Sequence, residues 1–308
     1  MKFTIQQTSR QGARPYNQDR LAYSYSKDAL LLVVADGMGG RQHGEIAAHL
    51  AVKTLTDTFQ RLAVPTLISP AQFLTQNILQ VHDMIESNPQ TEHLDEKPGT
   101  TVVAAVIQRG VLYCAHVGDS RLYHYRDGHL LFRTEDHSVV QALYKRGVIK
   151  QQDMAEHPYK NRIYNCLGGE ETPKVELSDK HELLDGDIVL LCTDGVWGAL
   201  EDNRIKEILH HNEIDLAITQ LLDEAELNGG DDGDNLSAIG VQWGERESSR
   251  FAVSTITMPL GTTTTIMNTF GSDFDAEALQ QDLTDDVIED TIAAIQAALS
   301  KAKHERKL

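Results

Sequence analysis

Four aspartates that each adjoin an apolar, strand-like run constrain the fold of this chain more than any other feature. They are Asp36 in VVADGMGG, Asp119 in AHVGDSRLY, Asp194 in VLLCTDGVW and Asp234 in GDNLSAIGV. A carboxylate beside a buried strand loses hydration, and it must be compensated by a cation, a metal ion or several hydrogen bonds. Four such positions indicate one shared metal centre.

The oxygen ligands at these positions favour a hard divalent cation. Mg²⁺ and Mn²⁺ prefer carboxylate, carbonyl and water oxygens, whereas zinc and softer metals prefer His and Cys. Each aspartate also adjoins a glycine, which permits a tight turn and a close approach of the backbone. The carbonyl oxygen of Gly37 is therefore a further candidate ligand. Taken singly, an Asp-Gly pair is more often a turn, but chance explains the joint pattern poorly.

Seven short motifs follow one another in a distinctive order. They are RPYNQD at residues 14–19, ADGMGG at 35–40, GTT at 99–101, VGDSR at 117–121, DHS at 136–138, TDGVW at 193–197 and DNLS at 234–237. In this order and spacing, residues 1–244 resemble the metal-dependent serine/threonine protein phosphatases of the PPM class (type 2C). The resemblance is greater to the compact bacterial branch than to the eukaryotic one.

The resemblance implies distinct roles for the charged residues and the glycine of these motifs. Asp36 would bridge two Mn²⁺ or Mg²⁺ ions, with the carbonyl of Gly37 on one ion. Asp194 and Asp234 would hold the other ion. A water or hydroxide shared by both ions would attack phosphorus, since two ions lower the pKa of a bridging water and stabilise in-line displacement. Arg14 would bind the phosphate through the paired donors of its permanently charged guanidinium; without this context it reads equally well as a surface arginine.

Two further carboxylates receive roles from the same resemblance. Asp19 would orient metal-bound water, a role that changes metal affinity or activity by about 10- to 100-fold. Asp119 would share a weaker third ion with Asp194. The alternative for Asp119 is a structural turn carboxylate that is hydrogen-bonded to Ser120 or Arg121.

The chain departs from the broader family at two positions. Met38 stands where eukaryotic members commonly have a histidine proposed to protonate the leaving oxygen, and methionine cannot donate a proton. Metal-bound water or another histidine must then supply it. His43 is one candidate, although a polar residue near the start of the next helix is the more common role for such a position. Gly198 stands where many relatives have another Asp near the metals, which weakens the expectation of a third ion.

Length and composition fit a globular, cytoplasmic enzyme. The 308 residues are 41% hydrophobic, which is enough for a sizeable core, and no apolar run reaches the roughly 18 residues of a membrane span. Cys114, Cys166 and Cys192 form no CxxC pair and suit a reducing compartment. The net charge of −18 argues against nucleic-acid and membrane partners. It favours phosphoproteins with basic residues near the phosphorylated side chain.

The hydrophobic pattern predicts an α+β fold. Strands are expected at residues 29–35, 101–107, 111–117, 121–125, 129–133 and 236–243. Helices are expected at 44–61, 70–87, 204–210 and 214–227. Short links between strands require antiparallel pairing, and two antiparallel sheets flanked by helices would bury the apolar faces. The resemblance supplies the specific four-layer α-β-β-α sandwich, with the metal centre at one end of the sheets.

The chain divides by pattern into a catalytic domain at residues 1–244 and an appendage at 245–308. Residues 138–170 interrupt the strand rhythm and resemble the family's flap; their basic side chains either meet the phosphoprotein or form a solvated helix face. The appendage begins with a Thr-rich linker and continues with an acidic amphipathic helix at about 275–303. Residues 275–290 contain seven acidic side chains and no basic one. This helix either packs on the catalytic domain, self-associates or binds a partner.

The sequence therefore predicts a Mn²⁺- or Mg²⁺-dependent phosphatase for phosphoserine and phosphothreonine in proteins. Its partners would be a cognate Ser/Thr kinase and the substrates of that kinase. Two alternatives stay open: a catalytically impaired phosphoprotein-binding or metal-sensing regulator on the same fold, and a metal-dependent hydrolase of a small phosphorylated metabolite. The presence of Arg14, Asp36, Asp194 and Asp234 favours the enzyme, because buried charge is costly to keep without a function.

Overall fold

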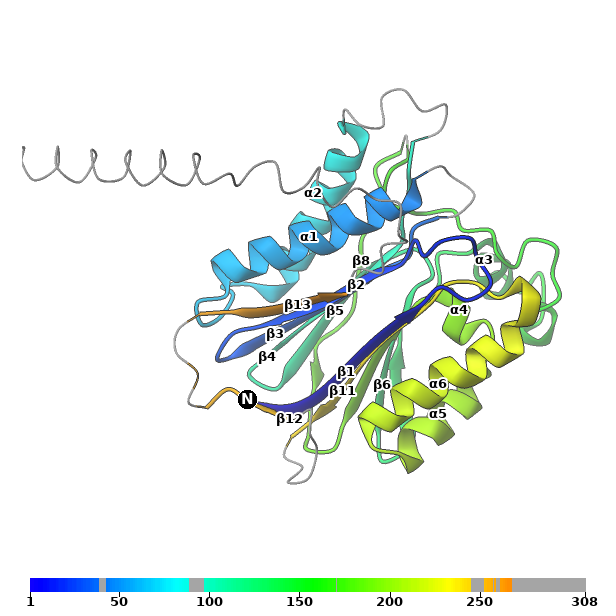
Figure 1. The fold of residues 1–308 in the computed structure, drawn as a ribbon. Helices are drawn as coiled ribbons and strands as arrows, with labels where there is room; N and C mark the ends of the chain where they lie inside the picture. The colour runs from blue at the N-terminus through cyan, green and yellow to red at the C-terminus, as the bar shows by residue number, and fades with distance from the viewer. Residues whose placement is uncertain are drawn as a thin grey trace, which may run out of the picture. The chain divides into compact units, whose positions relative to one another are not determined.

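Two antiparallel β-sheets face each other and are covered on their outer sides by helices (Figure 1). The computed structural model describes residues 1–38, 43–88, 97–169, 171–244, 252–256, 258 and 261–267. The chain divides into two units, residues 1–269 and 270–308, and all described residues belong to the first. The acidic helix expected at about 275–303 lies outside the described residues.

The two sheets are named here by their strands. Sheet A has the spatial order β12 (Ala252–Ser254), β1 (Lys2–Arg10), β11 (Leu236–Trp243), β10 (Ile188–Cys192), β6 (Arg121–Arg126) and β7 (His129–Arg133). Sheet B has the order β13 (Thr263–Met267), β2 (Arg20–Tyr25), β3 (Ala29–Ala35), β4 (Val102–Gln108), β5 (Val111–Val117) and β8 (Glu176–Leu177), with β9 (His181–Glu182) also on β5. The helices are α1 (Gly44–Leu62), α2 (Pro70–Glu86), α3 (Val139–Lys145), α4 (Asp194–Trp197), α5 (Asp202–His211) and α6 (Ile214–Gly229), with 3-10 turns at Gln151–Asp153 and Gly230–Asp232.

The central strands are apolar on both faces because each sheet is buried on both sides. In β3, Leu30, Leu32 and Val34 belong to the core between the sheets. Leu31 and Val33 belong to the core under α1 and α2. The same alternation in sheet A separates the core between the sheets from the core under α5 and α6. Successive side chains of a strand point to opposite faces, so the four layers enclose three hydrophobic cores.

Local sequence signals set the ends of the helices. α2 begins at Pro70, whose fixed φ and missing N–H suit the first helical turn. The side chain of Ser69 caps the helix by accepting a hydrogen bond from Gln72 N at 3.4 Å. Within the described residues, the expected helices and strands all form, with bounds that differ by no more than two residues from those expected.

Residues 252–267 depart from the expected layout. The sequence assigned them to a Thr-rich linker, yet β12 pairs with β1 and β13 pairs with β2, so each sheet gains a strand. Between the two strands, Thr255 Oγ1 donates a hydrogen bond to Lys27 O at 2.6 Å and accepts one from the Met1 amino group at 2.7 Å. Short strands at a sheet edge carry little apolar periodicity. The sheet-forming part of the chain therefore extends beyond residue 244.

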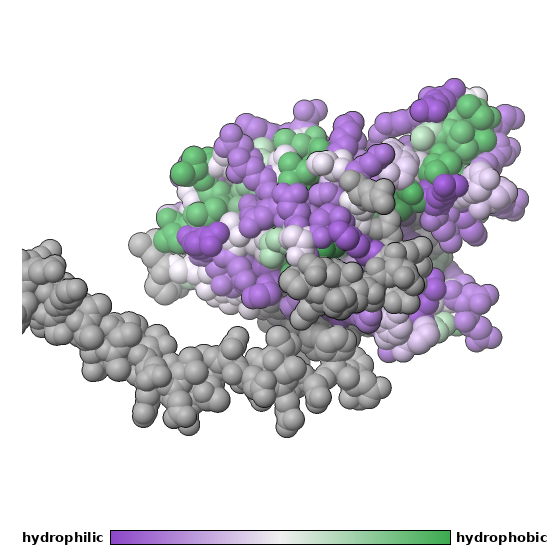
Figure 2. Space-filling view, turned by 90° about the horizontal axis from the view of Figure 1, so that it is seen from above, coloured by the Kyte–Doolittle hydropathy of each residue, from purple (hydrophilic) through white to green (hydrophobic). Residues whose placement is uncertain are grey.

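The surface seen in Figure 2 is mainly hydrophilic, with hydrophobic residues in smaller separate areas. Three large apolar side chains are exposed at the end of α1 and in the connection to α2: Leu62, Val64 and Ile68. Across the described part of the chain, every helix is too short or too polar to cross a membrane.

The topology brings the predicted site residues to one end of the sheets. β3 and β2 are antiparallel neighbours, so Asp36 at the end of β3 lies beside Asp19 at the start of β2. β10 and β11 are antiparallel as well, and Asp194, after β10, lies close to Asp234, before β11. The turn from β5 to β6 joins sheet B to sheet A, and it carries Asp119.

Candidate metal centre

The aspartates at this end of the sandwich perturb one another. Burial and neighbouring carboxylates, first that of Asp194, raise the pKa of Asp36 well above its ordinary value. Burial and Asp234 raise the pKa of Asp194 to about 6, although the Asp36 carboxyl lies within hydrogen-bonding reach. Burial raises the pKa of Asp19 to about 7. Like charges in a group of this kind favour a bound cation, because the cation offsets both the repulsion and the lost hydration.

Main-chain contacts hold Asp36 at the end of β3. Its carbonyl oxygen accepts hydrogen bonds from Thr101 N at 2.9 Å and from Thr100 Oγ1 at 2.7 Å. Just beyond it, Met38 N donates to Gly99 O at 3.0 Å. The GTT motif therefore fixes the loop that carries Asp36, a role that the sequence analysis did not assign.

Two glycines allow close contacts between backbones within the site. A Cβ on Gly37 would lie 2.5 Å from the carbonyl oxygen of Gly44, and a Cβ on Gly195 would lie 2.1 Å from that of Asn235. Only glycine leaves room for both contacts. The predicted ligand Gly37 thus lies where the loop after β3 meets the first residue of α1.

Asp19 is buried, with 1% of its surface exposed. Thr193 Oγ1 donates to Asp19 Oδ2 at 2.9 Å, and Ser237 N donates to Thr193 Oγ1 at 3.1 Å. Within the described part of the chain, Asp19 Oδ1 has no hydrogen-bond partner. A buried carboxylate oxygen without a donor is uncommon, and this one offers an acceptor for a water held by a cation.

Arg14 and Asp234 bind each other. Arg14 Nε donates to Asp234 Oδ1 at 2.9 Å, and Arg14 Nη2 donates to Asp234 Oδ2 at 2.7 Å. The exposed fractions of the two side chains are 50% and 39%, and the pair raises the pKa of Arg14. Among the residues that the structure describes, no group of three or more His, Cys, Asp or Glu side chains is arranged to hold a metal ion as it stands. The pairing of Asp234 with Arg14 is consistent with that result.

Asn235 anchors the loop that carries Arg14. Asn235 Oδ1 accepts a hydrogen bond from Gln18 N at 2.8 Å. Asn235 Nδ2 donates to Gln11 O at 2.7 Å and to Tyr16 O at 3.1 Å. These partners are at least 217 residues away in sequence, so the order of the motifs was the only signal for this role.

Asp119 lies in the turn between β5 and β6, with 7% of its surface exposed. Burial, Asp194 and Asp136 raise its pKa well above the ordinary value. The side chains proposed as its turn partners have other contacts: Ser120 Oγ lies 2.7 Å from Thr101 Oγ1. Arg121 pairs with Asp136. Asp119 is therefore electrostatically part of the same carboxylate group.

His43 precedes α1, and its side chain is 46% exposed. Its Nδ1 lies 3.3 Å from Glu45 Oε1, and Glu45 Oε2 accepts a hydrogen bond from Gln18 Nε2 at 3.1 Å. This position fits a residue at the start of a helix, and the proton-donor role of His43 stays a prediction.

Known proteins resemble the chain in both sequence and fold. The model of a family described as protein phosphatase 2C matches residues 6–228. The chain is 34% identical over 205 residues to serine/threonine phosphatase stp of Listeria welshimeri. The matched region covers 66% of this chain and 81% of that relative. The solved serine/threonine phosphatase of S. agalactiae has a TM-score of 0.71 and 30% identity, covering 79% of this chain and 100% of that chain.

A second solved structure is the catalytic domain of the serine threonine protein phosphatase PstP in complex with two manganese ions. It has a TM-score of 0.66 and 29% identity, and the match covers 78% of this chain and 98% of that chain. The expected fold of two antiparallel sheets flanked by helices is confirmed by these similarities.

Proposed function

The chain belongs to the protein phosphatase 2C family of serine/threonine protein phosphatases, and from that premise we propose that it uses two Mn²⁺ or Mg²⁺ ions to hydrolyse phosphoserine and phosphothreonine in proteins. It would reverse the action of a Ser/Thr kinase on the same proteins. Residues 1–244 would carry the activity, because all the proposed site residues lie within them. Strands β12 and β13 complete the edges of the two sheets.

One observation carries this proposal: carboxylates from separate strands gather at one end of the sandwich, where Asp19 and Asp119 are buried and Asp36, Asp194 and Asp234 are half-buried. Burial, and after it the charges of the neighbouring carboxylates, raise the pKa values of Asp36, Asp194 and Asp19. Such a group is costly to the fold unless a cation or a proton compensates it. At neutral pH, divalent cations would offset the charge of these carboxylates and would also activate water for hydrolysis.

The donor set fits hard divalent ions. Asp36 and Gly37 would hold one ion, and Asp36 with Asp194 and Asp234 would hold the other, all through oxygen. A weaker third ion would lie between Asp119 and Asp194. When bound, the pair of ions would acidify a water shared between them and stabilise the charge that develops on the phosphoryl group. The relative solved with two manganese ions supports this number.

Arg14 would bind the phosphoryl oxygens of the substrate. Its guanidinium is exposed at the rim of the site, and the Nε and Nη2 donors that now point to Asp234 suit two phosphoryl oxygens equally well. The Asp234 oxygens paired with Arg14 are those it would give to a cation. Arg14 would thus be free for phosphate when Asp234 serves the metal centre.

Asp19 and a proton donor would complete the site. Asp19, held by Thr193, would accept a hydrogen bond from water through its free Oδ1. The leaving seryl or threonyl oxygen needs a proton, which Met38 cannot supply. His43, exposed at the start of α1, is the candidate among the described histidines that lies closest in sequence to the Asp36 loop.

The test is phosphate release from a phosphothreonine peptide by metal-stripped protein, titrated with Mn²⁺ and with Mg²⁺. Turnover should require metal, and Asp194→Asn should retain less than about 1% of it, because loss of a metal ligand costs more than the 10- to 100-fold of a residue that only supports one. Asp232→Asn is the matched control. It removes the same charge from the exposed turn at Gly230–Asp232 and should leave turnover unchanged.

Two other outcomes would contradict the proposal, each in its own way. Tight binding of metal and phosphopeptide without turnover would identify a binding regulator. Turnover of small phosphorylated metabolites with none of phosphopeptides or phosphoproteins would identify a metabolite hydrolase.

A further inference from the structure

Trp197 connects the two aspartates that would share the third ion. It is the last residue of α4, whose first residue is Asp194. Its indole Nε1 donates a hydrogen bond to the carbonyl oxygen of Asp119 at 3.0 Å. The indole therefore ties the helix that carries Asp194 to the turn that carries Asp119, 78 residues earlier in the chain.

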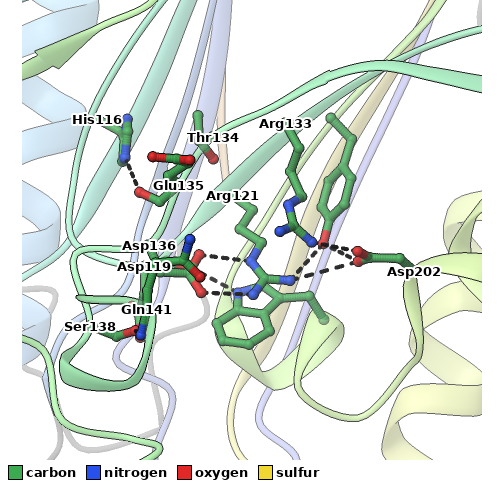
Figure 3. Close-up of polar contacts among 12 residues, drawn as sticks. His116, Asp119, Arg121, Arg133, Thr134, Glu135, Asp136, Ser138, Gln141 and Asp202 are labelled. Carbon is green, nitrogen blue, oxygen red and sulfur yellow. Dashed lines mark hydrogen bonds and ion pairs between the residues drawn. The ribbon is translucent and has the colours of Figure 1, made fainter. Parts of the chain in front are cut away.

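Arg121 holds the indole in place. Its Cζ lies 3.5 Å from the centre of the Trp197 ring, the distance of a stacked cation–π contact. Its Nε and Nη2 donate to Asp136 Oδ1 and Oδ2 at 2.8 and 2.7 Å (Figure 3). The two side chains are only 10% and 5% exposed. A buried, two-point ion pair fixes the plane of the guanidinium, and with it the plane of the stacked ring.

A second set of contacts holds Arg121 from its other side. Arg121 Nη1 donates to Tyr123 Oη at 3.1 Å, and Tyr123 Oη donates to Asp202 Oδ1 at 3.1 Å. Arg133 pairs with the other oxygen of Asp202 (Figure 3). Strands β6 and β7 and the start of α5 thus all brace the guanidinium, so Arg121 has little freedom to move away from Trp197.

The geometry points to Trp197 as a positioning residue that sets Asp119 against Asp194 and so determines the affinity of the third ion. This inference rests on the proposed metal-dependent function. Gly198, which follows Trp197, has no side chain that could serve as a ligand. The strength of the third site therefore depends on how firmly Asp119 and Asp194 are held, because partners of a ligand tune its affinity for metal.

The test is calorimetric titration of the metal-stripped full chain with Mn²⁺ alone. Trp197→Phe keeps a flat ring beneath Arg121 and removes the N–H that binds Asp119. The weakest Mn²⁺ binding step should weaken by about 10-fold, and the two tighter steps should keep their affinities. Thermal unfolding of the metal-stripped variant should change little by comparison.

Trp243 offers a matched control. It stacks on Phe3, with ring centroids 6.4 Å apart, at the end of β11 about 23 Å along the strand from Leu236, which lies at the metal end. Trp243→Phe removes the same group from the only other tryptophan. All Mn²⁺ binding steps should then match those of the unchanged protein.

Several results would overturn the inference. One is a titration of the unchanged protein that shows no third Mn²⁺ binding step. Another is a weakest step whose affinity is the same in Trp197→Phe as in the unchanged protein. A third is an equal loss of affinity at every step in Trp197→Phe. If Trp197→Phe fails to fold, Arg121→Lys replaces it, since lysine keeps the charge but loses the fork and the stacking; the same selective loss is expected. Absence of any Mn²⁺ binding would instead contradict the proposed function, which keeps the two failures distinguishable.

Discussion

Arg14 and Asp234 are the two residues of the site whose roles depend most on each other. In sequence they are 220 residues apart, and the motifs assigned them to different tasks, one to phosphate and one to metal. The structure pairs them through two hydrogen bonds. A two-point contact of this kind uses the planar fork of arginine, which lysine lacks.

Arg14→Lys should therefore keep the positive charge and lose much of the activity. Loss of one charge-assisted hydrogen bond is worth about 1.5 to 3 kcal/mol, so kcat/KM for a phosphothreonine peptide should fall by about 10- to 100-fold. Arg204→Lys is the control, because Arg204 pairs with Glu224 and Glu207 on the exposed surface of α5 and α6. Equal kcat/KM values for Arg14→Lys and the unchanged protein would exclude a role for the fork in phosphate binding.

Asp187 tests the electrostatics of the fold outside the site. It is fully buried and accepts hydrogen bonds from Arg126 at 2.8 and 2.7 Å and from His124 at 2.9 Å. Burial acts to raise the pKa of Asp187, but hydrogen bonds, first from Arg126, lower it below its ordinary value. The stabilisation is therefore fully present above the pKa of the unfolded chain and is lost as the pH falls through the folded pKa.

Asp187→Asn should lower the free energy of unfolding by about 2 kcal/mol at pH 7, because it takes the charged acceptor away from the buried His124 and from Arg126, whose side chain is 32% exposed. The difference from the unchanged protein should narrow as the pH falls below about 4, where carboxylates protonate. Denaturant unfolding across this pH range measures both effects. Asp179→Asn, at an exposed position, should change stability by less than about 0.5 kcal/mol. A difference that stays constant with pH would contradict the charge-based explanation.

The helices and strands were predictable where their burial requires a recognisable pattern of apolar residues in the sequence. β3 and β5 form at the residues expected, because seven apolar residues in β3, and six apolar residues out of seven in β5, leave little choice of boundary. β12 and β13 were not predicted, since a Thr-rich segment at an edge needs only one partner strand and buries little apolar surface. The contact between Trp197 and Asp119 was not predictable either, because nothing local to the two residues indicates it.

Removal of β12 and β13 should lower stability without changing catalysis. A chain that ends at residue 244 loses the pairings with β1 and β2 and the contacts of Thr255. We expect a net loss of about 1 to 2 kcal/mol, since most of the hydrogen-bond energy is offset by chain entropy. That loss corresponds to a melting temperature lower by about 2 to 8 °C.

The control for this truncation is a chain that ends at residue 269, which keeps the first unit whole. Its melting temperature should exceed that of the chain that ends at residue 244 by the same amount, about 2 to 8 °C for a domain of this size. Calorimetry of the three chains decides the question, and equal melting temperatures for all three would mean that residues 252–267 contribute nothing to the stability of the sheets.

The net charge of −18 acts on the scale of the whole molecule. A field of this sign should raise the association rate of basic substrates, and salt should screen it over about 10 Å at 0.1 M. The exposed lysines and arginines of residues 138–170 act in the opposite direction. Lys145 is already paired with Glu135, which weakens this local effect.

Phosphothreonine peptides with basic flanks should therefore be hydrolysed faster than matched peptides with acidic flanks. At low salt the ratio of kcat/KM values should be about 3 to 10, and it should approach one at about 0.5 M salt. Faster hydrolysis of the acidic peptide would show that the basic residues of 138–170, rather than the net charge, select the substrate.

Aspartates from four separate places in the sequence would form one metal centre at the end of the sandwich. Anomalous X-ray diffraction from crystals soaked in Mn²⁺ tests this arrangement most directly. Two strong peaks are expected, one beside Asp36 and Gly37 and the other beside Asp36, Asp194 and Asp234, with a weaker peak near Asp119. Strong peaks elsewhere on the molecule, with none at these carboxylates, would contradict it.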